Sequence, residues 1–270
     1  MTNEQKEDFL KQLESRRYNP NYIPQPDHRI LTIGNKLVGS LQNYVVISGL
    51  PKAGKSTFVS AAVSSAIQPS DVFDIKINLP DERKRICYID TESSDYDFFR
   101  QMERIKNFSL RTNLPNNFDA YSVREDTPNT IRKYIDNYIE LHNDCSLIII
   151  DGLLDLILNF NDELESRKLV NWLKKITKVY NILIIAVLHL GKKDGMTLGH
   201  LGSMTDRYAV STIEIVKDKE QQTFVMQSKF MRSDIDFEPI CLKNFNGTFQ
   251  QIPYEPTIQH NFKQNKKQQS

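Results

Sequence analysis

Short apolar runs alternate along the middle of the chain with longer segments in which apolar side chains recur every three or four positions. The runs that we expect to form buried strands are residues 44–48, 86–90, 118–123, 146–150 and 182–188. Short buried strands that alternate with amphipathic helices are typical of a mostly parallel sheet covered by helices on both faces. The pattern therefore predicts a three-layer α/β fold.

Helix signals agree with this alternation. Thr127 and Pro128 provide a cap and a first-turn proline, and the apolar positions between Ile131 and Ile139 then follow at spacings of three and four. Asp162 can cap a further helix that would bury Leu169, Leu173, Ile176 and Tyr180. Both helices are predicted to cover the sheet.

The two ends of the chain differ from its centre. Residues 1–27 are polar and contain three prolines, which predicts a short helix from Glu4 to Arg17 followed by an extended arm. Residues 253–270 lack the apolar side chains that offset the entropy of ordering, so we expect a disordered polar tail.

The region after Arg207 changes to short β runs at residues 211–217, 223–230 and 239–242, separated by polar turns. We expect antiparallel strands that extend the same sheet. Residues 28–252 are therefore predicted to form one domain.

Composition excludes several classes of protein. The net charge of +1 is not that of a chain that coats nucleic acid non-specifically, so any DNA contact must be a local patch. Three widely spaced cysteines support neither a disulfide framework nor a zinc cluster, and they favour a reducing cytoplasm. The apolar stretches are too short or too charged to cross a membrane.

The strongest chemical signal is a complete P-loop, which directly follows a predicted strand and directly precedes a helical run from Thr57 to Ile67. In such a loop, glycines let backbone N–H groups curl round a phosphate, and the amino terminus of the helix adds its positive end. We expect Lys55 to meet the β and γ phosphates of ATP and the Ser56 hydroxyl to bind Mg²⁺. The predicted nucleotide-binding residues are Gly49, Leu50, Pro51, Lys52, Ala53, Gly54, Lys55, Ser56 and Thr57.

A second acid is needed for the magnesium shell, and the apolar run 147–150 ends in Asp151. We expect Asp151 to be this Walker B carboxylate. Many ATPases place the water-activating glutamate at the next position, which here is Gly152. The base must therefore come from elsewhere, and the run 85–90 delivers two candidates, Asp90 and Glu92, to the same edge of the sheet.

At this point the chain resembles the RecA-like ATPases, and its motifs at 49–56, 89–92, 150–152, 188–189 and 199–202 are most similar to the RepA-type branch of plasmids, phages and mobilisable elements. The resemblance implies a three-layer RecA-like P-loop NTPase with a mostly parallel sheet extended by antiparallel strands. It implies that Glu92 polarises the attacking water. It also implies that His189, after a buried strand, senses the γ phosphate.

The same resemblance implies an assembly. In RecA-like rings, the loop equivalent to residues 191–207 contacts single-stranded DNA, and Lys192, Lys193 and His200 would make that contact here. Such rings also carry a Lys-x-Arg pair that reaches the neighbouring subunit's γ phosphate. This chain has Lys-x-x-Arg instead, so Lys229, Arg232 or both would serve, with Arg207 as a further candidate.

These features predict a cytoplasmic, Mg²⁺-dependent ATP hydrolase that forms a homo-oligomer, expected to be a hexameric ring, and acts on DNA in a helicase-like or motor role. The alternative is an ATP-dependent regulatory switch or loader that acts on protein partners without unwinding DNA. A small-molecule kinase is disfavoured, because Glu92 suits a water nucleophile and the chain has no Arg-rich lid segment.

Overall fold

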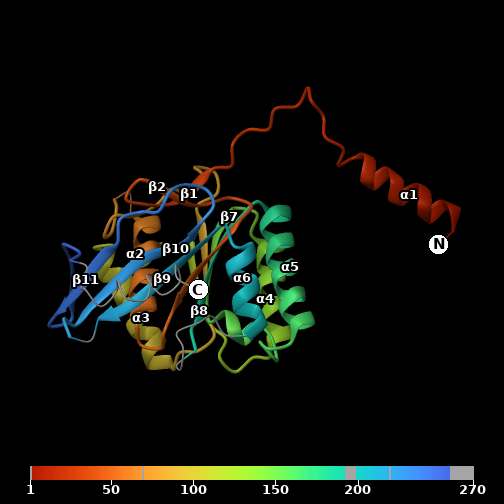
Figure 1. Ribbon diagram of the computed structural model, residues 1–270. Helices are drawn as coiled ribbons and strands as arrows, with labels where there is room; N and C mark the ends of the chain where they lie inside the picture. Colours follow the sequence, from red (N-terminus) through yellow and green to blue (C-terminus); the bar gives the residue numbers. More distant parts are fainter. Residues whose placement is uncertain (1, 69, 192–198, 219, 256–270) are drawn as a thin grey trace, which may run out of the picture.

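The computed structural model describes residues 2–68, 70–191, 199–218 and 220–255. Its centre is a nine-stranded sheet with the order β12-β11-β10-β9-β3-β8-β7-β5-β6 (Figure 1). The strands from β9 to β6 in this order run parallel, whereas β10, β11 and β12 are antiparallel. In chain order the strands are β3 Tyr44–Gly49, β5 Arg85–Asp90, β6 Phe118–Ser122, β7 Cys145–Asp151, β8 Leu183–His189, β9 Ser211–Asp218, β10 Thr223–Met231, β11 Ile240–Phe245 and β12 Thr248–Ile252.

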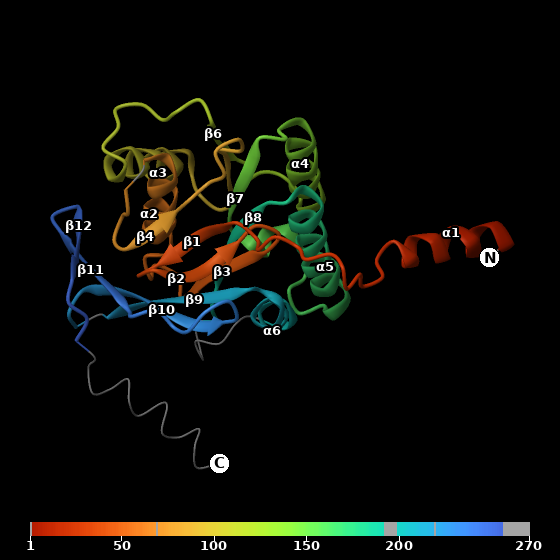
Figure 2. The ribbon, with the colours of Figure 1, turned by 90° about the horizontal axis from the view of Figure 1, so that it is seen from above.

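Helices cover both faces of this sheet, with α2 and α3 on one side and α4, α5 and α6 on the other (Figures 1 and 2). Alternate residues of the parallel strands enter two separate cores, as the pleat of a strand requires. Ile47 and Ile149 pack in the core beneath α2 and α3, whereas Val46 and Ile150 pack in the opposite core. The helices are α2 Lys55–Ile67, α3 Asp95–Phe108, α4 Pro128–Leu141, the short 3₁₀ helix η1 Leu153–Leu156, α5 Glu163–Tyr180 and α6 Gly199–Tyr208. This confirms the predicted three-layer α/β fold.

The predicted caps are present. The Thr127 hydroxyl accepts the Thr130 backbone N–H at the start of α4, and the Asp162 carboxylate accepts the Glu165 N–H at the start of α5. Each side chain satisfies one of the amide groups that a helix leaves unpaired at its amino end.

Several elements differ from the expectation. The first strand after Arg207, β9, pairs parallel with β3, so only β10, β11 and the unpredicted β12 are antiparallel. A small sheet of β1 Arg29–Ile33, β2 Lys36–Ser40 and β4 Ile75–Ile77 was also not predicted. Its short strands are stabilised by burial in the core beneath α2 rather than by their own pattern.

Part of the predicted 191–207 loop is a helix, because residues 199–208 form α6. Two glycines within this stretch favoured a loop, but Leu201 and Thr205 are fully buried and α6 packs along α5. Tertiary packing has overridden local propensity here. Lys192 and Lys193 lie outside the described residues.

At the amino end, α1 Asn3–Glu14 projects away from the body at the end of an exposed arm (Figure 1). A capping box between Thr2 and Gln5 stabilises the start of this helix, and the helix ends three residues before the predicted Arg17. Most of the predicted tail, residues 256–270, lies outside the described residues. Among the helices of the described residues, none is long and apolar enough to cross a membrane. The three cysteines are buried and unpaired.

Candidate functional site

The register of the parallel strands gathers the predicted site residues at one edge of the sheet. Gly49, at the end of β3, pairs with His189 at the end of β8. Asp90, at the end of β5, pairs with Asp151 at the end of β7. Because these four strands are neighbours, their carboxyl ends form a continuous edge, which is where ligands of open α/β sheets bind.

The P-loop connects β3 to α2 and buries its lysine. Gly54 caps α2 with a φ of +95°, and a Cβ there would meet the Phe224 ring at 2.6 Å. Lys55 is 5% exposed. Its Nζ donates to the carbonyl oxygens of Gly49 at 2.9 Å and Leu50 at 3.0 Å. Burial lowers the pKa of Lys55 to about 8, although Glu92 and Asp151 oppose that shift.

A continuous chain of contacts links Lys55 to Glu92 through His189. Lys55 Nζ lies 3.0 Å from His189 Nδ1, and His189 Nε2 lies 2.8 Å from Glu92 Oε2. Because a lysine ammonium is only a donor, His189 accepts at Nδ1 and donates its Nε2–H to the carboxylate. Three of the predicted catalytic residues are therefore linked through His189, and the Glu92 side chain remains 41% exposed.

Asp90, the other candidate base, has a different environment. It is 1% exposed, and its Oδ1 accepts the backbone N–H groups of Glu92 at 3.0 Å and Ser93 at 2.7 Å. The Asp90 carboxylate thus holds the turn that presents Glu92, which leaves Glu92 as the accessible carboxylate of the two.

The predicted metal acid, Asp151, accepts a hydrogen bond from the fully buried Tyr88 hydroxyl at 2.6 Å. The pKa of Asp151 is raised to about 6. Burial is the largest cause and the nearby Asp90 and Glu92 carboxylates act in the same direction, whereas the Tyr88 hydrogen bond opposes the rise. A cation bound to this carboxylate would therefore stabilise its ionised form.

Gly152 shows why the base does not follow Asp151 directly. It has a φ of +125°, and a Cβ there would meet the Thr91 hydroxyl at 1.9 Å. That hydroxyl donates to Asp155 Oδ2 at 2.7 Å, so Asp155 helps to hold the loop that follows β5. Any side chain at position 152 would displace the loop that carries Glu92.

The residues present fit ATP and Mg²⁺. Glycines line the cradle, a buried ammonium lies at its base, and the half-buried Ser56 lies in the first turn of α2, at the same sheet edge as Asp151. Within the described residues, no cluster of three or more His, Cys, Asp or Glu side chains could hold a metal alone. Magnesium commonly binds through one or two protein ligands, phosphates and water, which is what Ser56, Asp151 and a bound nucleotide would provide.

Comparison with known proteins agrees with this site. A family model for an AAA domain, AAA_25, matches residues 35–195, more than half of the chain. The chain belongs to this AAA domain family. The matched segment contains the P-loop, Glu92, Asp151 and His189.

The fold of this AAA domain protein is similar to the crystal structure of a KaiC-like protein from the hyperthermophilic archaeon Pyrococcus horikoshii OT3. The TM-score is 0.54 at 12% sequence identity, over 79% of this chain and 91% of that chain. At such low identity the likeness concerns the fold alone. No curated protein matches the sequence. The family and the fold together indicate a P-loop ATPase domain with a RecA-like fold.

The predicted finger residues of this ATPase lie away from its own P-loop. Gly49 is opposite Ile215, and Ile215 is opposite Met226, so Lys229 lies three residues further along β10 toward the amino end of β3. Because β10 has a register shift between Ser228 and Phe230, that offset is two to three residues of the neighbouring strand, or about 8 Å. Lys229 Nζ contacts Asp206 Oδ2 of α6 at 2.7 Å, and Arg232 is exposed just beyond β10.

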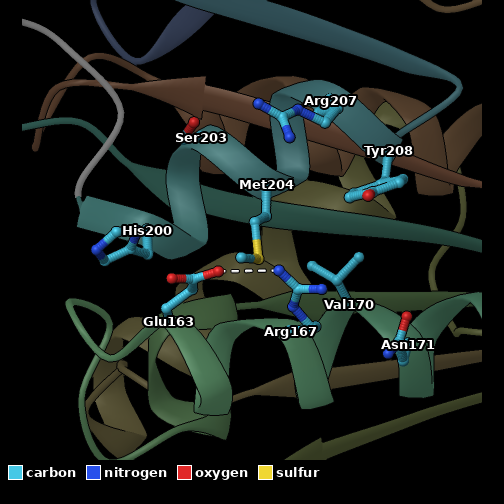
Figure 3. Close-up of a pocket in the computed structure, with 9 residues that line it drawn as sticks. All are labelled: Glu163, Arg167, Val170, Asn171, His200, Ser203, Met204, Arg207 and Tyr208. Atoms are coloured by element: carbon cyan, nitrogen blue, oxygen red, sulfur yellow. Dashed lines mark hydrogen bonds and ion pairs between the residues drawn. The ribbon is translucent and has the colours of Figure 1, made fainter.

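Helices α5 and α6 border a polar cleft of about 300 Å³ (Figure 3). His200 and Arg207, two residues predicted to act on DNA or a neighbour, line this cleft together with Arg167 and Tyr208. Arg167 is paired with Glu163 at 2.9 Å, as the dashed line in Figure 3 shows. His200 and Arg207 are thus on a surface of the body and outside the P-loop site.

Sequence reasoning missed Tyr88 and Gln101. Tyr88 lies in an apolar run, where a tyrosine indicates a core residue, and its hydroxyl contact with Asp151 depends on strand register. Gln101 Nε2 donates to the Ser56 carbonyl oxygen at 2.9 Å. It belongs to α3, whose place beside α2 was not predicted.

The raised pKa of Asp151 predicts how the unfolding free energy of the metal-free protein depends on pH. Its folded value of about 6 exceeds the ordinary 3.8, so the folded protein holds the extra proton between these values, and stability falls as the pH rises through this window. Above about pH 6 the folded protein bears the full free-energy cost of an ionised Asp151. We therefore expect Asp151→Asn to raise the metal-free unfolding free energy by about 1 to 3 kcal/mol.

Urea unfolding of the wild type and Asp151→Asn at about pH 8 and about pH 4 measures this effect, which should disappear at the lower pH. The exposed Asp236→Asn serves as the control and should change little at either pH. Equal stability of Asp151→Asn and the wild type at the higher pH would contradict the burial argument.

Proposed function

We propose that the chain is a Mg²⁺-dependent ATP hydrolase of the RecA/RepA type that forms a homo-oligomeric ring, expected to be hexameric. We propose that it acts on DNA in the replication, mobilisation or recombination of a plasmid, phage or mobile element. The observation that carries the hydrolase assignment is the contact chain from Lys55 through His189 to Glu92, beside the half-buried Asp151.

Each residue has a role that its contacts support. Lys55 supplies a cation from the base of the loop, where its hydrogen bonds to two carbonyl oxygens and His189 can be exchanged for phosphate oxygens. Ser56 and Asp151 hold Mg²⁺, which when bound stabilises negative charge on the phosphates. The accessible Glu92 carboxylate orients the attacking water and accepts its proton.

His189 couples the lysine and the base. It contacts both Lys55 and Glu92, so a change in the position of Lys55 alters the hydrogen bond that orients Glu92. His189 also ends β8, only ten residues before α6 begins at Gly199. This connection supports the proposed sensing role, in which nucleotide state reaches the α5–α6 surface.

Single-stranded DNA is proposed to contact that surface. His200, Arg207 and Tyr208 line the α5–α6 cleft, and Tyr208 is 44% exposed with Lys174 Nζ 4.8 Å from the centre of its ring. Cationic side chains with an exposed aromatic ring suit a backbone of phosphates with stacking bases.

DNA-stimulated hydrolysis tests this function. We expect ATP turnover with Mg²⁺ to rise with single-stranded DNA above the level seen with duplex DNA or with none, since the cleft would engage unpaired bases. Lys55→Ala should abolish ATP binding and turnover, because the loop backbone alone holds the phosphates weakly. Lys133→Ala removes an exposed lysine of α4, outside the P-loop site, and is the control.

An ATP turnover rate that is the same with single-stranded DNA, duplex DNA and no DNA would contradict the DNA role. It would favour the alternative, a switch or loader that acts on proteins. Unchanged ATP affinity in Lys55→Ala would contradict the nucleotide site itself.

A cation from a neighbouring subunit is proposed to complete the site. Lys229 and Arg232 are offset from their own P-loop along β10, so they suit a role across a subunit boundary better than one in their own site. Negative charge that develops on the γ phosphate is commonly stabilised by such a finger. Arg207 on α6 is a further candidate.

Mixing two inactive proteins tests the finger. Lys55→Ala is titrated against a Lys229→Gln, Arg232→Gln double variant. In a mixed ring, some double-variant sites keep their P-loop lysine and receive the finger from a Lys55→Ala neighbour, so ATP turnover should return in part. Co-assembly without any recovery would contradict a finger in trans.

A further inference from the structure

Two proposed magnesium ligands lie on different elements, Ser56 on α2 and Asp151 at the end of β7. An octahedral ion such as Mg²⁺ tolerates little error in the positions of its ligands. Contacts that fix the position of α2 relative to the end of β7 would therefore be needed for metal binding.

Tyr88 contacts Asp151. Its side chain is fully buried in the core beneath α2 and α3, and its hydroxyl donates to Asp151 Oδ2 at 2.6 Å. This hydrogen bond occupies one carboxylate oxygen and leaves Oδ1 for a metal ion. It also restricts rotation of the Asp151 side chain, because the tyrosine ring itself cannot move within a packed core.

Gln101 contacts Ser56. Its side chain is 5% exposed, and Nε2 donates to the Ser56 carbonyl oxygen at 2.9 Å. Arg104, which can only donate, binds Gln101 Oε1 at 2.8 Å and so sets which end of the amide faces Ser56. The first turn of α2 is thereby tied to α3.

Tyr88 and Gln101 belong to consecutive elements, β5 and α3, joined by the short turn that carries Glu92. One β5–α3 unit thus contacts both ligand-bearing elements and presents the proposed base. We propose that Tyr88 and Gln101 are positioning residues that hold Asp151 and Ser56 at the separation that Mg²⁺ requires. This inference rests on the proposed function, since that function makes Ser56 and Asp151 the metal ligands.

The test compares two buried tyrosines of the same sheet, Tyr88 on β5 and Tyr44 on β3. Tyr88→Phe removes the hydroxyl that contacts Asp151. Tyr44→Phe removes a hydroxyl that is equally buried, lies at the opposite end of β3, and has no hydrogen-bond partner among the described residues. The readout is the Mg²⁺ concentration that gives half-maximal binding of a fluorescent, non-hydrolysable ATP analogue.

We expect Tyr88→Phe to raise this Mg²⁺ concentration about tenfold, as loss of a partner that orients a metal ligand commonly does. Binding of the analogue in EDTA should not change, because the phosphate cradle remains intact. Tyr44→Phe should match the wild type in both measurements. An unchanged Mg²⁺ requirement in Tyr88→Phe, or the same rise in Tyr44→Phe, would overturn the proposal.

A second variant and a double variant separate the possible failures. Gln101→Met should raise the Mg²⁺ requirement in the same way, and it decides the question if Tyr88→Phe does not fold. In an Asp151→Asn background, Tyr88→Phe should add nothing, because its effect acts through that carboxylate; an additive effect would contradict positioning. If Asp151→Asn itself leaves the Mg²⁺ requirement unchanged, the metal assignment of the proposed function fails instead.

Discussion

The structure depends on the parallel register of four adjacent strands. Gly49 lies beside His189 and Asp90 lies beside Asp151 because β3, β8, β7 and β5 run in one direction and end at one level. A shift of one residue in any of these pairings would turn every side chain of that strand to the opposite core. Burial of Ile47, Val46 and their neighbours in two separate cores opposes such a shift.

Burial at this edge brings opposite charges into a setting of low polarity. The pKa of Lys55 is lowered and that of Asp151 is raised, and in both cases desolvation is the largest cause. The charged form of each group is therefore stabilised when an opposite charge binds beside it, a phosphate for the lysine and a cation for the aspartate. The same desolvation that costs stability in the empty protein thus favours binding of the metal–nucleotide complex, which supplies both charges together.

The sequence was sufficient for the layered α/β fold, because the buried strands and the caps of α4 and α5 are local signals. It also predicted which segments meet at the carboxyl edge, since parallel strands leave no other arrangement. It failed where packing decides the local structure. Residues 199–208 form a helix against α5, and β9 joins β3 in parallel.

Within the site, the polar residues that follow strands could be predicted, whereas those inside apolar patterns could not. Tyr88 resembles any core tyrosine in the sequence, and its contact with Asp151 requires knowledge of how β5 pairs with β7. The ambiguity between Asp90 and Glu92 is also a matter of three-dimensional structure. Asp90 faces backbone N–H groups within its own turn, and Glu92 faces His189.

The most direct test of the account is single-turnover hydrolysis of ATP by Glu92→Gln and Asp90→Asn, with ATP affinity measured in parallel. Loss of a general base commonly slows the chemical step by about two to four orders of magnitude, and we expect Glu92→Gln to show this loss while it still binds ATP. Asp90→Asn should retain most of the rate, because an asparagine oxygen can still accept the two N–H groups of the turn. Normal hydrolysis in Glu92→Gln together with loss of hydrolysis in Asp90→Asn would contradict the assignment.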